Sequence, residues 1–151
     1  MHNASIWFHG TNQKYLDEQL REYGEYVGII TKGQFGDERK GIYLAENCAG
    51  MAMVRAIETA REYKSSPILL ISSSEVINDR LRRGNTCMKI YCGWPKELFL
   101  TMDVPIRNPN DDFGYDKERF KDELGILLHR QALFTVPESF NWNKVVEYFG
   151  W

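Results

Sequence analysis

Short apolar runs, separated by polar segments that contain glycine, mark the strands that this sequence predicts. Runs of this kind, bounded by Gly, Pro, Asn or Ser, are typical of β-strands. The run at 68–71 has no polar alternation, so we expect a strand that is buried on both faces. Gly10, Thr11 and Asn12 are expected to break the first run. The expected strands are 5–8, 41–45, 68–71, 87–94 and 97–106, with 26–31 as a strand or an extended segment.

Apolar side chains that recur every three or four residues predict helices between these strands. The expected helices are 14–23, 46–64 and 117–134, with a short helix or a loop at 73–86 and a short helix or strand at 141–151. The second helix carries alanines along one face, which allow it to pack closely on a sheet. Glu46 or Asn47 is expected to cap its start. Gly125 weakens the prediction for the third helix, because glycine is a poor helix former.

The order of these elements predicts an α+β fold. Several short strands, with one long helix between the second and third clear strands, are typical of an α+β sandwich. The chain has 151 residues, which is most simply a single domain over 1–151. That length is sufficient to bury a core without metal ions or disulfides.

The composition changes this picture only in detail. The formal net charge is −2, so the chain has no global basic field that would attract nucleic acid. Its one basic cluster, at Arg80, Arg82, Arg83 and Lys89, is either a solvated face or a local patch for nucleic acid. Aromatic residues make up 13% of the chain, and rings that the core does not need often line a pocket or a partner surface.

The cysteines and the absence of long apolar runs indicate the cellular compartment of the protein. Cys48, Cys87 and Cys92 show no CxxC spacing, which argues against a disulfide framework and against a zinc site. We expect no metal, and we expect the cysteines to be buried as small apolar residues. No signal peptide is visible, and no apolar run approaches the length that crosses a bilayer. These features predict a cytoplasmic protein without a membrane partner.

Three segments carry candidate chemistry: "FHGT" at 8–11, "KGIYLAEN" at 40–47 and "KELFLTMDVPI" at 96–106. Each has an ordinary structural explanation when it is taken alone. His9 could be a hydrogen-bonded residue at a strand end, Tyr43 a core aromatic, and Glu97 a solvent-facing charge at the start of a strand. The three segments are more informative as an ordered set.

In that order the segments "WFHGTN", "GIYLAENCAGMAMVRA" and "ELFLTMDVPI" resemble the ADP-ribosyltransferase superfamily. The resemblance is to its His-Tyr-Glu branch, which includes poly(ADP-ribose) polymerases and many small bacterial and phage enzymes. It spans about residues 6–106. It implies an ADP-ribosyltransferase-like split β-sandwich with flanking helices, and NAD as the substrate.

The resemblance also implies a role for each motif residue. His9 would hydrogen-bond the adenosine ribose of NAD, and Thr11 would support His9 through its hydroxyl. The backbone of Gly10 would hold the nicotinamide amide, where the missing side chain permits close approach. Tyr43 would stack on the nicotinamide ring. Gly41, which opens the second motif, is assigned to the cofactor site with them.

Glu97 would supply the catalytic carboxylate. Cleavage of the nicotinamide–ribose bond passes through an oxocarbenium-like transition state, which a carboxylate stabilises. Glu97 would bind the 2′-hydroxyl of the nicotinamide ribose and polarise the acceptor nucleophile. Asp103 is the alternative, because an offset of six residues keeps it on the same face of the expected strand.

The expected activity is the transfer of single ADP-ribose units. Nothing in the chain matches the helical regulatory domain of the nuclear polymerases. The acceptor would be a protein or a nucleic acid, and the enzyme could serve as a toxin or a phage-defence effector. The aromatic segment 140–151 is either a tail packed on the core or a docking site for an antitoxin or chaperone. Two alternatives remain open: an NAD-dependent RNA 2′-phosphotransferase, and an inactive module that binds ADP-ribose or a partner.

Overall fold

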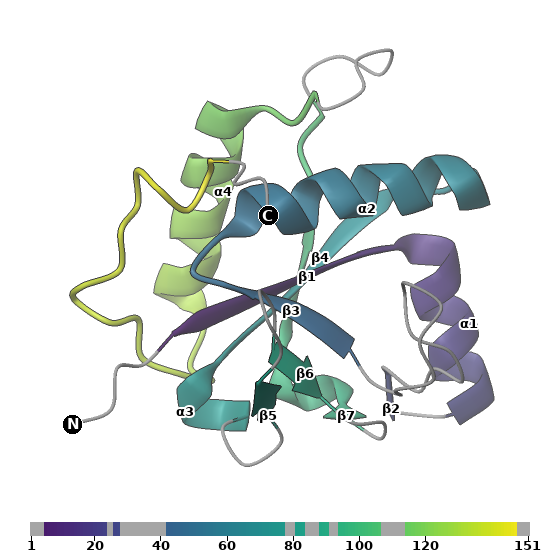
Figure 1. Cartoon of the computed structure of the whole chain (residues 1–151), viewed down its shortest axis with the longest axis horizontal. Coiled ribbons are helices and arrows are strands. Elements are labelled where there is room, and N and C mark those ends of the chain that lie inside the picture. The colour runs from purple at the N-terminus through teal and green to yellow at the C-terminus, as the bar shows by residue number, and fades with distance from the viewer. Residues whose placement is uncertain are drawn as a thin grey trace.

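The structure is a computed structural model, and it describes residues 5–23, 26–27, 42–77, 81–83, 88–90, 94–106 and 114–147. The expected α+β class is confirmed. The elements, in chain order, are β1 (Ile6–Asn12), α1 (Gln13–Tyr23), β2 (Tyr26–Val27), β3 (Ile42–Glu46), α2 (Ala49–Tyr63), β4 (Pro67–Ser73), α3 (Ser74–Ile77), β5 (Leu81–Arg83), β6 (Met88–Ile90), β7 (Trp94–Pro95), the 3-10 helix η2 (Lys96–Leu98), β8 (Leu100–Asp103) and α4 (Lys117–Arg130) (Figure 1).

The strands form one large sheet and one small sheet. The large sheet has six strands in the order β5-β6-β3-β1-β4-β8, and its paired neighbours run antiparallel. The small sheet pairs β2 with β7. The first and second motifs therefore lie on the neighbouring strands β1 and β3, and β4 separates β1 from β8 at the edge of the sheet.

The two edges of β1 differ in their pairing. Every residue of β1, from Ile6 to Asn12, is paired with β4. On the other edge, β3 pairs only Glu46 with Trp7 and Ala45 with Phe8. The preceding residues of β3, Ile42 to Leu44, have no register partner in β1, and they pair with β6 through the opposite edge of the strand. We name this divergence the β1–β3 fork, and Figure 1 shows the two strands separating toward the end of β1.

One face of the large sheet carries the first core, into which Ile6 and Phe8 point from β1. This core unites the sheet with α2, α4 and the segment that follows α4. The alanines predicted to pack on a sheet do so, because Ala49, Ala52 and Ala56 are buried there. The opposite face carries the smaller second core, which is built from Trp7, Leu16, Leu44, Ile68, Leu70, Ile77 and Phe99.

The predicted break after Phe8 is wrong, because β1 continues to Asn12. Gly10 faces α2 in the strand, and a Cβ atom there would lie 2.0 Å from the carbonyl oxygen of Ala52. The glycine thus permits close packing of helix on strand rather than a turn. Asn12 ends the strand by capping α1, since its Oδ1 accepts the N–H of Tyr15 at 2.9 Å.

Two helix ends also differ from the prediction. The residue that caps α2 is Cys48, and its side chain makes no capping hydrogen bond. Asn47 is instead used by β1, because its Oδ1 accepts the N–H of Ile6 at 2.9 Å. α4 ends at Arg130 rather than at Phe134, because the side chain of Gln131 binds the backbone N–H groups that follow the helix. Its Oε1 accepts the N–H groups of Leu133 and Phe134, at 2.7 and 2.9 Å.

The segment 141–147 is packed as a tail on the start of α2, in turns rather than in the expected helix or strand. The N–H of Ala49 donates to the carbonyl of Val145 at 2.8 Å, and the buried thiol of Cys48 donates to Glu147. The Tyr115 hydroxyl donates to the carbonyl of Val146 at 2.9 Å. Burial, with the nearby charge of Glu147, raises the pKa of Tyr115 to about 12.

Candidate functional site

His9 lies in the middle of β1, on the face of the second core. It is half-buried and stands opposite Leu70 of β4. Alternate residues of a strand share a face, so His9 lies beside Trp7 and Thr11. Both neighbours are buried, with Trp7 at 2% and Thr11 at 5% exposure. The side chain of His9 is therefore on the face of the sheet opposite the first core, whereas the backbone of β1 lies between the two faces.

The backbone of Gly10 faces the fork. At the start of β1, Ile6 accepts the N–H of Asn47 at 2.8 Å on the β3 side, whereas Ser5 accepts the N–H of Ser74 at 2.9 Å on the β4 side. Backbone groups of alternate residues point to the same edge of a strand. The N–H and C=O of Gly10 consequently point toward β3, as those of Ile6 do. The described register pairs no residue of β3 with Gly10.

Tyr43 lies on the other arm of the fork. It belongs to the part of β3 that has left β1, and it pairs with Lys89 of β6. Ala45, two residues later, is the residue that pairs with Phe8 of β1. The start of β1 thus lies beside the end of β3, and the two strands diverge toward the end of β1 and the start of β3. Gly41, the other predicted residue of this motif, lies outside the described residues.

Glu97 does not lie in a strand. The expected strand 97–106 is shorter, since β8 covers only Leu100–Asp103, and Glu97 stands before it in the 3-10 helix η2. The turn is closed by the N–H of Phe99, which donates to the carbonyl of Lys96 at 3.3 Å. The side chain of Glu97 is exposed. Glu97 and Asp103 therefore do not share a strand face, contrary to the prediction.

A buried serine fixes η2 against the sheet. The hydroxyl of Ser72, on β4, donates to the carbonyl of Leu98 at 2.5 Å. Ser72 is fully buried and stands opposite Trp7 in the β1–β4 register. The turn that carries Glu97 is thereby attached to the row of residues that neighbours His9. Sequence reasoning missed Ser72, because a serine in an apolar run has no distinguishing pattern.

The second core joins the three motif segments. Trp7 lies two residues before His9, Leu44 follows Tyr43, and Phe99 lies two residues after Glu97. All three are buried in this one cluster. The residues next to the three candidate groups are therefore in a common apolar core, although they are separated by up to 92 positions in the sequence.

Asp103 occupies a different position. It is exposed at the end of β8, opposite Ile68. It borders an open groove of about 690 Å³ between β8 and α4, which Ile106, Ile126 and Arg130 also line. Of the two candidate carboxylates, Glu97 is the one whose segment contributes to the second core.

The remaining candidate features are only partly placed. Arg82 and Lys89 of the basic cluster are register partners in β5 and β6, and Arg80 lies outside the described residues. Within the described ranges, no three His, Cys, Asp or Glu side chains gather as metal ligands. None of the described helices has the length and apolar character to cross a bilayer.

No family model, curated protein or solved structure matches the chain.

Proposed function

We propose that this protein is an NAD-dependent ADP-ribosyltransferase that adds single ADP-ribose units to a macromolecule. Its fold would then be the split β-sandwich of that superfamily, with the division of the sheet at the β1–β3 fork. The motif residues would be His9, Gly10, Tyr43 and Glu97, in the roles that the resemblance implies.

The convergence of the three motif segments carries this proposal. Trp7, Leu44 and Phe99 share the second core, so the backbones next to His9, Tyr43 and Glu97 are held together by one buried cluster. A site that acts on one ligand needs this anchoring, because catalysis depends on fixed relative positions.

The chemistry would be divided between the backbone of Gly10 on β1 and the side chain of Glu97 on η2. The N–H and C=O of Gly10, which point toward β3, can form a pair of hydrogen bonds with a carboxamide, which has a matching acceptor and donor. Holding the leaving nicotinamide would orient the bond that breaks. Glu97, exposed on η2, would bind the 2′-hydroxyl of the ribose and stabilise the positive charge that develops. It would also polarise the incoming nucleophile.

The acceptor in this proposal is a protein or a nucleic acid. The basic pair Arg82 and Lys89 lies on β5 and β6, at the other end of the sheet from β8. A nucleic-acid acceptor would use these cations for its phosphates, whereas a protein acceptor would not need them.

The decisive experiment measures nicotinamide release and transfer of label from radiolabelled NAD in a cell lysate. The proposal expects release and a labelled macromolecule, and parallel protease and nuclease digestion identifies its class. Glu97→Gln should lower the rate about 10²- to 10⁴-fold while the unfolding midpoint stays unchanged, because Glu97 is exposed. Glu138→Gln, which changes another exposed glutamate, is the matched control.

His9→Ala tests the other side of the site. The proposal expects weaker use of NAD with an intact fold, whereas an unfolded variant would favour a structural role for His9. Absence of both nicotinamide release and transfer in the wild-type protein would contradict an enzymatic function. Binding of ADP-ribose without turnover would then favour the inactive binding module.

A further inference from the structure

Arg55 is a charged residue of α2 that has no role among the predicted motif residues. The helix packs on β1 through Ala52 and Ala56, whose backbone atoms are the nearest neighbours of a Cβ atom built at Gly10. On one flank of this stripe, Val54 and Ile57 enter the first core with α4. At 100° per residue, Arg55 lies on the opposite flank. Residues of α4 and β8 line one groove, and β8 lies beyond β4, so the flank of α2 that carries Arg55 is the one on the side of β3.

Arg55 is also at the level of the fork along the helix. It lies between the two alanines that contact Gly10. The N–H and C=O of Gly10 point toward β3, and the flank of α2 that carries Arg55 lies on this same side. The Arg55 side chain and the backbone groups of Gly10 are thus on the same side of β1, toward β3.

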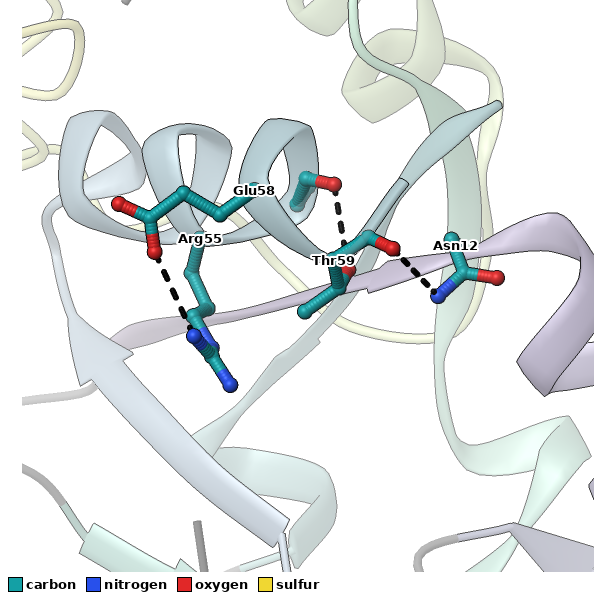
Figure 2. A network of polar contacts seen from close by, with 5 residues as sticks. Asn12, Arg55, Glu58 and Thr59 are labelled. Carbon is teal, nitrogen blue, oxygen red and sulfur yellow. Dashed lines mark hydrogen bonds and ion pairs between the residues drawn. The ribbon is translucent and has the colours of Figure 1, made fainter. Parts of the chain in front are cut away.

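The position of the helix is fixed independently of Arg55. The Nδ2 of Asn12 donates to the carbonyl of Thr59 at 3.5 Å, which attaches the end of β1 to α2 (Figure 2). The hydroxyl of Thr59 donates to the carbonyl of Ala56 at 3.2 Å. Replacement of Arg55 should therefore leave the packing of α2 on β1 unchanged.

The ion pair of Arg55 is weak by its geometry. Its Nη1 lies 3.4 Å from Oε2 of Glu58, and the two side chains are 38% and 49% exposed. Exposed pairs of this kind contribute little to stability. In Figure 2 the Arg55 side chain extends from α2 toward the strands, while Glu58 stays alongside the helix. The pair engages Nη1, and a guanidinium has further donors at Nη2 and Nε.

We infer that Arg55 binds a phosphoryl group of the ligand that occupies the β1–β3 fork. A guanidinium is the side chain best suited to a phosphate, since it offers planar, paired donors and a permanent charge. The phosphate is the diphosphate of NAD or a phosphate of a nucleic-acid acceptor, and both present the same oxygen chemistry. The inference rests on the proposed function, and it assigns to that site a residue outside the motifs.

The test compares a ligand that carries the diphosphate and the terminal ribose, ADP-ribose, with one that lacks both, adenosine. Calorimetry on the wild-type protein should show tighter binding of ADP-ribose than of adenosine. Arg55→Ala should weaken ADP-ribose about 10- to 100-fold and leave adenosine unchanged, because only the phosphate contact is lost. Arg55→Lys should recover part of this loss through its charge. Arg119→Ala, which removes the arginine of another exposed pair, Arg119–Glu123 at 3.0 Å on α4, is the matched control.

The two sources of phosphate give different results. If Arg55→Ala weakens ADP-ribose, the contact is to the diphosphate of NAD. If it weakens only a 5′-phosphorylated oligonucleotide, the contact is to the acceptor. Equal losses for ADP-ribose and adenosine, or no loss for either phosphate ligand, would overturn the inference while leaving the proposed function in place. A wild-type protein that binds neither NAD nor ADP-ribose nor the oligonucleotide would overturn both.

Discussion

The two edges of β1 differ in how much of each is paired with a neighbouring strand. The β4 edge is paired along the whole strand from Ile6 to Asn12, whereas on the other edge the described strand β3 pairs with Trp7 and Phe8. The paired edge satisfies its backbone groups within the sheet. On the other edge the backbone of Gly10 is directed at the fork, where no described residue of β3 pairs with it. An interruption of a ladder near the centre of a sheet is therefore a place where a ligand can take the role of a strand.

Hydrogen exchange should reveal this difference most strongly. The amide of His9 faces β4 in the paired ladder, and the amide of Gly10 faces the fork. We expect the Gly10 amide to exchange faster than that of His9 by on the order of 10³-fold, because exchange of the latter requires the sheet to open. Amide exchange followed residue by residue by NMR measures the ratio.

The amide of Phe8 is the internal control for this measurement. It points to the same edge as Gly10 but lies within the β1–β3 ladder, so it should be protected. Saturating NAD should slow the exchange of Gly10 and leave Phe8 unchanged. Similar protection of Gly10 and Phe8 without NAD would show that the open edge is satisfied by another group.

Gly10→Ala should destabilise the protein by about 3 kcal/mol or more. The added Cβ would meet the Ala52 carbonyl oxygen at 2.0 Å and the Ala56 nitrogen at 2.7 Å. Both neighbours are backbone atoms, which cannot move away by a change of rotamer, so the cost lies at the upper end for overpacking. Urea unfolding measures the difference. A loss below about 1 kcal/mol would mean that α2 can shift from β1 at little cost.

Sequence patterns predict the elements that local periodicity controls. The helix expected at 14–23 is found at Gln13–Tyr23, and the buried strand expected at 68–71 is found at Pro67–Ser73. The misplaced boundaries depend on distant partners. Gly10 continues a strand because α2 packs on it, and Glu97 lies in a turn that a serine of β4 holds. A single sequence contains no signal for such contacts.

The candidate site shows the same division. The sequence predicts the motif residues and their order, but not that their neighbours share one core, because Trp7, Leu44 and Phe99 are brought together only by the sheet. The role that we propose for Arg55 is not predicted from the sequence, for a related reason. An arginine on an amphipathic helix is usually a solvent-exposed charge, and the flank that it occupies depends on how α2 packs.

Tyr115→Phe tests how much the packing of the segment 141–147 on the start of α2 contributes to stability. The hydroxyl donates to the carbonyl of Val146 in a buried position, so its loss should cost about 1–2 kcal/mol near neutral pH. The pKa of Tyr115 is raised from 10.0 to about 12 in the folded protein. The stabilising effect is therefore complete below about pH 10 and is lost as the pH rises toward 12.

The variant and the wild-type protein should consequently become more similar in stability over that interval of pH. Urea unfolding at pH 7 and at steps from pH 9 to about 12 follows the difference. A gap that stays constant with pH would contradict the raised pKa. Exchange at Gly10 should not change in this variant, because the tail contacts α2 at its start and not at the fork.

Gly125→Ala is the smallest expected effect, and it has the opposite sign to Gly10→Ala. A Cβ atom at this position of α4 would meet nothing within 4 Å. The alanine adds no clash, and it reduces the conformational entropy that the unfolded chain loses in forming the helix. We expect the free energy of unfolding, measured with urea, to rise by about 0.5–1 kcal/mol.

Because both variants add one methyl group to a glycine, the difference in sign isolates the packing of α2 on β1. Loss of stability in Gly125→Ala would mean that an unidentified group packs on this part of α4, and that the cost at Gly10 cannot be assigned to the contact with α2 alone.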